Sequence, residues 1–202
     1  MGDLLRREPW LAGFTAAHVA AFTVVGVALE RPFLWVYMPL LAAAAIVVVL
    51  IDRRGGPLPG ALLWMLSLWA AAHLAGGLLG DPSGRRDILY NWWLVDGLLR
   101  WDQVVHGFGI GVVTVVVVFA ARRSQRPWVV GLVWGQGIGV GNELVENTFA
   151  TFVEGSNVGD AVNTAWDMAF HLIGGAAALL WMWRTGFPQS STLTESPTTT
   201  AT

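Results

Sequence analysis

The chain has 202 residues, of which 54% are hydrophobic and 13% are charged. Soluble domains carry about 25% charged residues, so the composition argues against an ordinary soluble fold. Cysteine is absent, which excludes disulfides, thiolate metal ligands and cysteine nucleophiles. The net charge of -2 comes with no basic cluster, and we therefore expect no nucleic-acid partner.

Apolar stretches long enough to cross a bilayer recur along the chain, since a helix of about 20 residues spans the hydrocarbon core. We expect an all-α polytopic membrane protein with about six transmembrane helices, forming a single domain over residues 1–184. The expected spans are 11–29, 33–51, 61–80, 101–121, 127–150 and 162–183.

Two segments fall outside these spans. The stretch DPSGRRDILYNWWLVDGLLR at 81–100 mixes apolar residues with tryptophans, which indicates an interfacial or re-entrant segment. Asp96-Gly97 within it has the composition of a turn. The end of the chain, 185–202, is rich in Ser, Thr and Pro, and we expect a disordered cytoplasmic tail.

The arginines fall unequally on the two sides of the predicted bundle. Four lie on one side, Arg31, Arg85, Arg86 and Arg100, and eight on the other: Arg6, Arg7, Arg53, Arg54, Arg122, Arg123, Arg126 and Arg184. Because basic residues accumulate in cytoplasmic loops, both termini are expected in the cytoplasm. Tryptophans near both ends of the spans would then form an aromatic belt at each membrane surface.

With this topology, four spans carry polar residues at a similar depth below the outer surface. At 1.5 Å per residue, four of these residues lie about 8–14 Å deep: His73, His106, Glu143 and His171. Helical spacing places Asp102 with His106, Glu143 with Glu146, and Asp167 with His171 on shared helix faces. An uncompensated charge at this depth costs about 2.5–3.5 kcal/mol, so we expect the groups to face one pocket that opens to the outside.

Small residues are spaced for close helix packing on the same spans. Glycines recur every fourth residue in two rows on the fifth span and one row on the fourth. The rows are Gly131, Gly135 and Gly139; Gly137 and Gly141; and Gly107 and Gly111.

Purely structural roles are possible for several of these residues. Asp102 is favoured near a helix N-terminus by the helix dipole, and Asp160 lies where a helix cap would stand. Asn142 and Asn163 are able to hydrogen-bond between helices without any ligand.

Four segments of the chain resemble the YjdF-like family of bacterial inner-membrane proteins: AHLAGG at 72–77, RWDQVVHGFG at 100–109, NELVEN at 142–147 and GDAVNTAWDMAFHLIGG at 159–175. The resemblance places His73, Asp102, His106, Glu143, Glu146, Asp160, Asp167 and Gly174 at motif positions. His171 departs from the pattern, because an asparagine is expected there. More loosely, the chain is similar to VanZ-like membrane proteins, whose association with glycopeptide resistance implies cell-envelope chemistry.

The first functional hypothesis is a metal-dependent hydrolase or transferase that acts on a lipid or envelope substrate. Histidine and carboxylate ligands suit Zn, Mn or Fe. The candidate metal ligands are His106, Glu143, Glu146, Asp167 and His171. The candidate catalytic residues are Asp102, His106, Glu143 and Asp167. The candidate substrate-binding residues are His73, Arg85, Arg86, Asn142, Asp160 and Asn163.

Two alternatives remain open from the sequence. Intramembrane Asp, Glu and His also build proton relays, so a proton-coupled transporter is the second hypothesis. It requires a polar path in the inner half of the bundle, near Gln136 and His18. The third hypothesis is a non-catalytic membrane factor whose polar cluster only holds the helices together. Under all three hypotheses we expect membrane lipids as partners of the protein.

Overall fold

The computed structural model describes residues 6–83, 88–153 and 160–187. Six long helices dominate this part of the chain and confirm the all-α polytopic membrane fold. They are α2 (Pro9–Ala28), α3 (Leu34–Gly55), α4 (Gly60–Leu78), α5 (Trp101–Ala120), α6 (Pro127–Phe152) and α7 (Ala161–Thr185). Each end lies within four residues of its predicted position.

Five of the six helices are long and apolar enough to cross a membrane. The exception is α6, which has 26 residues and is therefore about 39 Å long. Its second half contains Asn142, Glu143, Glu146 and Asn147, which lower its hydropathy. Because α6 packs against both α5 and α7, it belongs to the same bundle as the five apolar helices.

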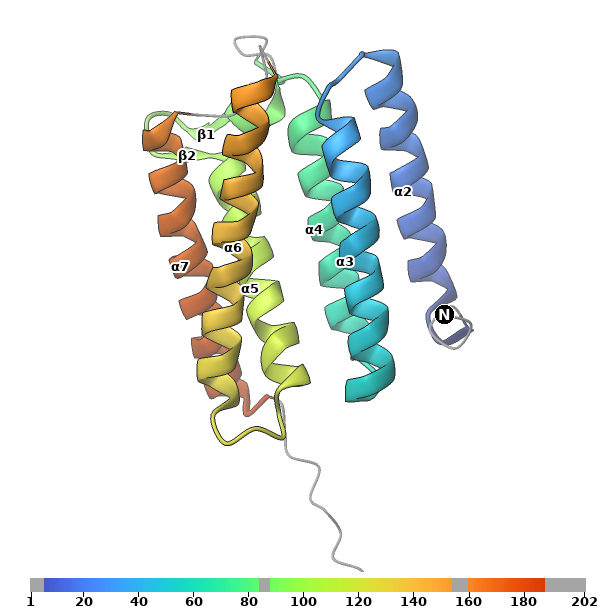
Figure 1. The fold of residues 1–202 in the computed structure, drawn as a ribbon, viewed down its shortest axis with the longest axis vertical. Helices are drawn as coiled ribbons and strands as arrows, with labels where there is room; N and C mark the ends of the chain where they lie inside the picture. Colours follow the sequence, from blue (N-terminus) through green and yellow to red (C-terminus); the bar gives the residue numbers. More distant parts are fainter. Residues whose placement is uncertain (1–5, 84–87, 154–159, 188–202) are drawn as a thin grey trace, which may run out of the picture.

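Successive helices run in opposite directions, so the start of α2 and the end of α7 lie at the same end of the bundle (Figure 1). The end of α6 and the starts of α5 and α7 meet at the opposite end, which we call the upper end. Helix α5 is the most buried of the five apolar helices and contacts α4, α6 and α7. Polar residues on α5 are therefore well placed to meet polar residues of three other helices.

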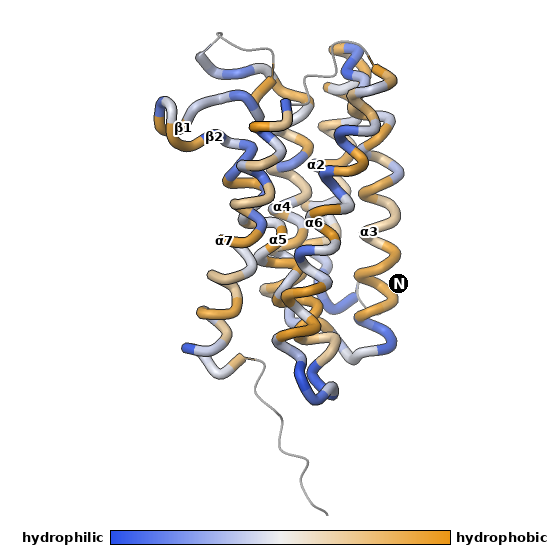
Figure 2. Tube along the Cα trace, turned by 60° about the vertical axis from the view of Figure 1, so that its left-hand side comes forward, coloured by the Kyte–Doolittle hydropathy of each residue, from blue (hydrophilic) through white to orange (hydrophobic). Residues whose placement is uncertain are grey.

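The outside of the bundle is apolar along the middle of the helices and more polar toward both ends (Figure 2). Many large apolar side chains are exposed, including Val133, Leu144 and Leu172. Tryptophans near the helix ends are exposed as well, with Trp10 at 85% and Trp35 at 74%. This pattern matches a bundle whose surface is covered by lipid tails and bordered by interfacial aromatic residues.

The segment between α4 and α5 folds over the upper end of the bundle (Figure 1). Its described residues form a 3₁₀ turn, η1 (Leu89–Asn91), and a short antiparallel hairpin, β1 (Trp93–Val95) and β2 (Leu99–Arg100). The predicted turn is confirmed, since Gly97 adopts a positive φ of 70° between the strands. Of the predicted regions, Arg85 and Arg86 and residues 188–202 of the tail lie outside the described residues.

One row of glycines on α6 makes the close contacts that its spacing predicts. A Cβ at position 131 would lie 3.1 Å from the Thr114 carbonyl oxygen of α5, and a Cβ at 139 would lie 2.6 Å from His171 Nδ1 of α7. The second row was predicted wrongly: at Gly137 and Gly141 an added Cβ meets nothing within 4 Å. The helix turns the first row toward its neighbours and leaves the second row outside.

This difference gives a matched test of the packing. Gly131→Ala forces α6 away from α5 and is expected to cost about 1–3 kcal/mol, which lowers the melting temperature by several degrees. Gly137→Ala adds the same methyl group in open space and leaves the melting temperature unchanged or higher. Tryptophan fluorescence during thermal unfolding in detergent measures both variants. Equal melting temperatures for the two variants would contradict this packing.

Candidate metal centre

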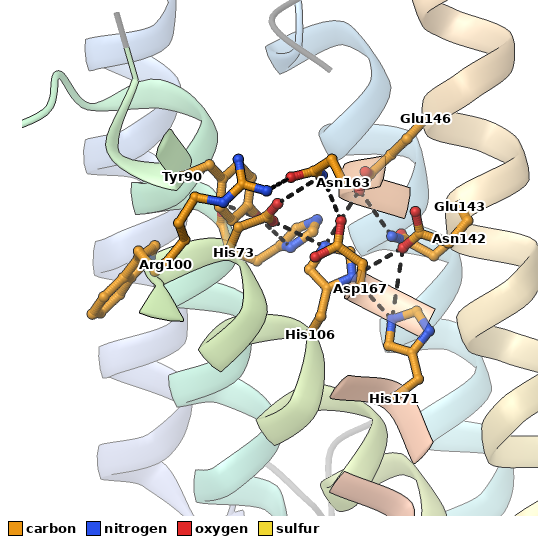
Figure 3. A network of polar contacts seen from close by, with 12 residues as sticks. His73, Tyr90, Arg100, His106, Asn142, Glu143, Glu146, Asn163, Asp167 and His171 are labelled. Atoms are coloured by element: carbon orange, nitrogen blue, oxygen red, sulfur yellow. Dashed lines mark hydrogen bonds and ion pairs between the residues drawn. The ribbon is translucent and has the colours of Figure 1, made fainter. Parts of the chain in front are cut away.

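Three helices place their polar residues at one level in the upper half of the bundle (Figure 3). The group, called here the polar cluster, consists of Asp102 and His106 from α5, Asn142, Glu143 and Glu146 from α6, and Asn163, Asp167 and His171 from α7. The structure therefore brings together residues that are up to 69 positions apart in the sequence, as their predicted depth requires.

The first part of the polar cluster is a trio formed by His106, Glu143 and His171. His106 Nδ1 lies 3.0 Å from Glu143 Oε1 and 2.9 Å from His171 Nε2. His171 Nε2 lies 3.7 Å from Glu143 Oε1. All three residues are buried, at 4%, 5% and 1% exposure respectively. Three ligand-type atoms from three helices thus converge on one small volume.

The second part is a trio formed by Asp102, His106 and Asp167 on the other side of the same imidazole. His106 Nε2 lies 3.2 Å from Asp102 Oδ1. The Asn163 amide nitrogen donates to Asp102 Oδ2 at 3.2 Å and to Asp167 Oδ2 at 2.6 Å. This bridge occupies the Oδ2 atom of each aspartate.

The bridge is itself held in place by the residue before α5. The Arg100 guanidinium donates to the side-chain oxygen of Asn163 and stacks on Trp93 at 5.3 Å from the ring centroid. The Arg100 backbone N–H donates to Gln103 Oε1 at 2.9 Å, which closes the first turn of α5. The positive charge of Arg100 thus faces the polar cluster from its edge.

Glu146 lies at the border of the polar cluster. Its Oε1 accepts from the Asn142 amide at 2.8 Å and lies 3.9 Å from His106 Nε2. It is less buried than Glu143, with 16% of its side chain exposed. Glu143 is also tied to its own helix, since the Asn147 amide donates to the Glu143 carbonyl at 2.8 Å.

An aromatic layer closes the polar cluster toward α3 and α4. Its members are His73, whose ring centroid lies 6.4 Å from that of His106, and both tyrosines of the chain. The Tyr90 hydroxyl contacts His73 Nδ1 and donates to the His73 carbonyl at 3.1 Å. Burial raises the pKa of the Tyr90 phenol above its usual value, so Tyr90 keeps its proton.

Glycines of α4 make room for this layer. The Tyr90 ring fills the space beside Gly76, and the Tyr37 ring fills the space beside Gly77. A side chain at either position would overlap a tyrosine ring. The AHLAGG sequence therefore serves the site twice, once through His73 and once through the two glycines.

Several buried atoms of the polar cluster lack a hydrogen bond within the described residues. They are His106 Nε2, Glu143 Oε1, Asp167 Oδ1 and His171 Nδ1. The first two still have ion-pair contacts, at 3.2 Å to Asp102 Oδ1 and 3.0 Å to His106 Nδ1, so Asp167 Oδ1 and His171 Nδ1 are the two without a polar partner among the described residues. Leaving a buried polar atom unpaired costs about 1–3 kcal/mol, and native structures rarely gather such atoms at one place. The arrangement indicates that something else binds here.

The first trio has dimensions that suit a metal ion. Tetrahedral zinc with bonds of about 2.0 Å holds its ligand atoms about 3.3 Å apart. The three separations of 2.9, 3.0 and 3.7 Å lie on both sides of this value. The second trio also has ligand atoms within 4.8 Å of one another. The residues present thus fit a divalent cation.

The polar cluster is closed to solvent in this structure. Asp167 and His171 are 0% and 1% exposed, and the two cavities described are lined by other residues. An opening of the site to the outside stays a prediction. One of these cavities is an apolar groove between α4, α5 and α7.

The remaining predicted site residues lie around the polar cluster. Asp160 is the N-cap of α7 and accepts hydrogen bonds from the backbone N–H groups of Val162 and Asn163. This is the helix-capping role that the sequence offered as an alternative to substrate binding. His73 contacts the Tyr90 hydroxyl, and its ring lies 6.4 Å from the His106 ring without a hydrogen bond to it.

Sequence reasoning missed the supporting residues. Arg100 and Tyr90 both lie in the segment before α5, where the sequence showed no span. Arg100 directly precedes the Asp102–His106 pair, and Tyr90 is one of two tyrosines in the chain. The position of Arg100 beside this pair and the rarity of tyrosine are the two sequence signals that would have added both residues to the candidates.

The bundle and its closed centre define a polytopic helical membrane protein with a buried histidine–carboxylate cluster. The chain belongs to the DUF2238 family, described as predicted membrane proteins, whose match covers residues 10–186. No curated protein and no solved structure matches the chain.

Proposed function

We propose that the protein is a metal-dependent hydrolase or transferase that acts on a lipid or a lipid-linked envelope substrate. The observation that carries this proposal is the convergence of His106, Glu143 and His171 from three helices, with their ligand atoms within 4.8 Å of one another and buried. Imidazole and carboxylate ligands favour Zn, Mn or Fe at such a site.

Each residue then has a role that its position supports. His106, Glu143 and His171 hold the ion, and Glu146 lies beside them as a further carboxylate. A bound divalent ion would supply Lewis-acid activation of water or of a phosphoryl or carbonyl oxygen. Asp102 and Asp167, bridged by Asn163, are placed to accept or return a proton, Asp102 through His106 and Asp167 through its unpaired Oδ1.

The apolar groove supports a lipid as the substrate. It encloses about 500 Å³ and runs from Gln103 on α5, next to Asp102, down to Trp181 on α7. Both helices are candidate membrane spans, so hydrocarbon and not water surrounds the groove in a bilayer. Leu99 lines the groove, so its neighbour Arg100 brings a positive charge near that end of the groove for an anionic headgroup. We therefore assign the groove to the acyl chain of a bilayer lipid.

The cellular setting is proposed on the same basis. The quoted motifs support placing the chain with YjdF-like proteins in a bacterial cytoplasmic membrane, and the VanZ-like comparison rests on the sequence pattern alone. Both termini would be cytoplasmic, because the arginine-rich helix ends all lie at the lower end. The polar cluster would then lie toward the outer surface, where envelope lipids are available.

The geometry gives less support to the two alternative functions, a proton-coupled transporter and a purely structural cluster. A proton-coupled transporter needs a polar path near Gln136 and His18. Gln136 donates a hydrogen bond of 3.0 Å to the His171 carbonyl, and the His18 ring has no hydrogen bond to any described residue that would continue the path. A purely structural cluster should pair all of its buried polar atoms, whereas Asp167 Oδ1 and His171 Nδ1 have no polar partner among the described residues.

Metal content tests the proposal directly. Purified protein is expected to contain about one or more equivalents of a transition metal by elemental mass spectrometry, and Glu143→Ala is expected to lose the ion held by His106, Glu143 and His171. Asp96→Ala removes a carboxylate in the exposed hairpin turn and serves as the control that keeps the metal. A wild-type protein that stays metal-free after purification without chelators and dialysis against Zn, Mn or Fe would rule out the metalloenzyme and favour the structural cluster.

Lipid binding tests the groove. Ala177 lines the groove, whereas the neighbouring Ala176 is also exposed but does not line it. Ala177→Phe is expected to fill the groove and to reduce the phospholipid that co-purifies with the protein several-fold, as measured by mass spectrometry, while Ala176→Phe retains it. The metal content should not change in either variant.

Two outcomes would overturn the assignment of the groove to a lipid. One is equal lipid retention by Ala177→Phe and Ala176→Phe. The other is a change from dimer to monomer in Ala177→Phe alone, because the occupant would then be a second copy of the chain.

A further inference from the structure

The His106 ring faces potential ligands on both of its edges (Figure 3). Nδ1 is directed at Glu143 and His171, and Nε2 at Asp102. With Asp167, the ligand atoms form two separate trios, and His106 is the only residue that belongs to both. One imidazole thus stands between two groups of possible metal ligands.

A neutral imidazole cannot satisfy both edges, because it carries a proton on only one nitrogen. If Nδ1 donates toward Glu143, the lone pair of Nε2 faces Asp102 Oδ1 at 3.2 Å, which is repulsive. If Nε2 donates, the lone pair of Nδ1 faces Glu143 Oε1 at 3.0 Å. A cation on the edge without a proton removes this conflict.

The second trio also contains a buried atom without a polar partner. Asp167 Oδ1 has no hydrogen bond within the described residues, and Asp167 is 0% exposed. Asn163 binds the Oδ2 atoms of Asp102 and Asp167, which leaves Asp167 Oδ1 without a partner and Asp102 Oδ1 directed at His106 Nε2. The support of Asn163 by Arg100 keeps this orientation fixed.

The charge of the polar cluster favours two cations. Asp102, Glu143, Glu146 and Asp167 contribute four negative charges when ionised, and Arg100 contributes one positive charge, so three negative charges remain. One divalent ion leaves one negative charge in a region where uncompensated charge is costly. A second divalent ion changes this remainder to one positive charge, which the loss of the His106 ring proton cancels.

We propose that the protein binds two divalent cations, one in each trio, with His106 as the shared ligand between them. This inference rests on the proposed metal chemistry of the first trio and adds a second ion at Asp102, His106 and Asp167. Binding of both ions requires both ring nitrogens as ligands, so the ring N–H proton is released to solvent as the second ion binds. The two carboxylates make the second trio the better site for a harder ion such as Mn²⁺.

The number of bound ions tests the inference. Detergent-purified protein is saturated with Zn²⁺ or Mn²⁺, freed of excess metal and analysed for metal per chain. About two equivalents are expected for the wild type and for the control Asp96→Asn, about one for Glu143→Gln and for Asp167→Asn, and fewer than one for His106→Gln. Asp102→Asn is a second variant of the second trio and should match Asp167→Asn. Size-exclusion chromatography identifies variants that fail to fold.

The failures of the two proposals are distinguishable. A wild type with about one equivalent, unchanged in Asp167→Asn and Asp102→Asn but lost in Glu143→Gln, would overturn the second site and leave the first in place. A wild type that binds no ion at all would overturn both, because His106 would then carry a second proton between Asp102 and Glu143.

Discussion

The structure depends on how a carboxylate is stabilised where water is scarce. In the hydrocarbon region a charged side chain needs a cation, a proton or a set of hydrogen-bond donors, because lipid offers none of these. The chain places Asp102, Glu143 and Asp167 on three different helices and buries all of them at one level. The helices must therefore pack closely enough for the three residues to share a counter-charge, and the rest of the bundle serves that requirement.

Close packing is provided by residues without side chains. Gly131 and Gly139 bring α6 against α5 and α7, and Gly107 faces Gly174 where α5 crosses α7. Gly76 and Gly77 admit the two tyrosine rings that close the polar cluster on the side of α4. A helix backbone that approaches this closely leaves no room for lipid or bulk water, which strengthens every electrostatic interaction inside. Packing and site chemistry are thus two results of the same glycine pattern.

Much of this arrangement could be predicted from sequence, since it depends on properties read along a single helix. Apolar runs of known length gave the helix ends, and the rise per residue gave the common depth of His106, Glu143 and His171. What could not be predicted depends on how helices rotate about their axes. Gly137 and Gly141 have the right spacing but the wrong face, and the contact between Arg100 and Asn163 joins residues 63 positions apart. Neither rotation nor a contact between distant helices is encoded in local periodicity.

The central claim is that the histidine–carboxylate centre holds a metal ion. X-ray absorption at the edge of the bound metal tests it most directly, since it reports the ligand atoms themselves. The account predicts nitrogen and oxygen ligands at about 2.0–2.2 Å with the outer-shell scattering of imidazole, and a loss of imidazole scattering in His171→Gln. An oxygen-only shell without imidazole scattering, unchanged in His171→Gln, would show that any metal present is bound elsewhere and would contradict the account.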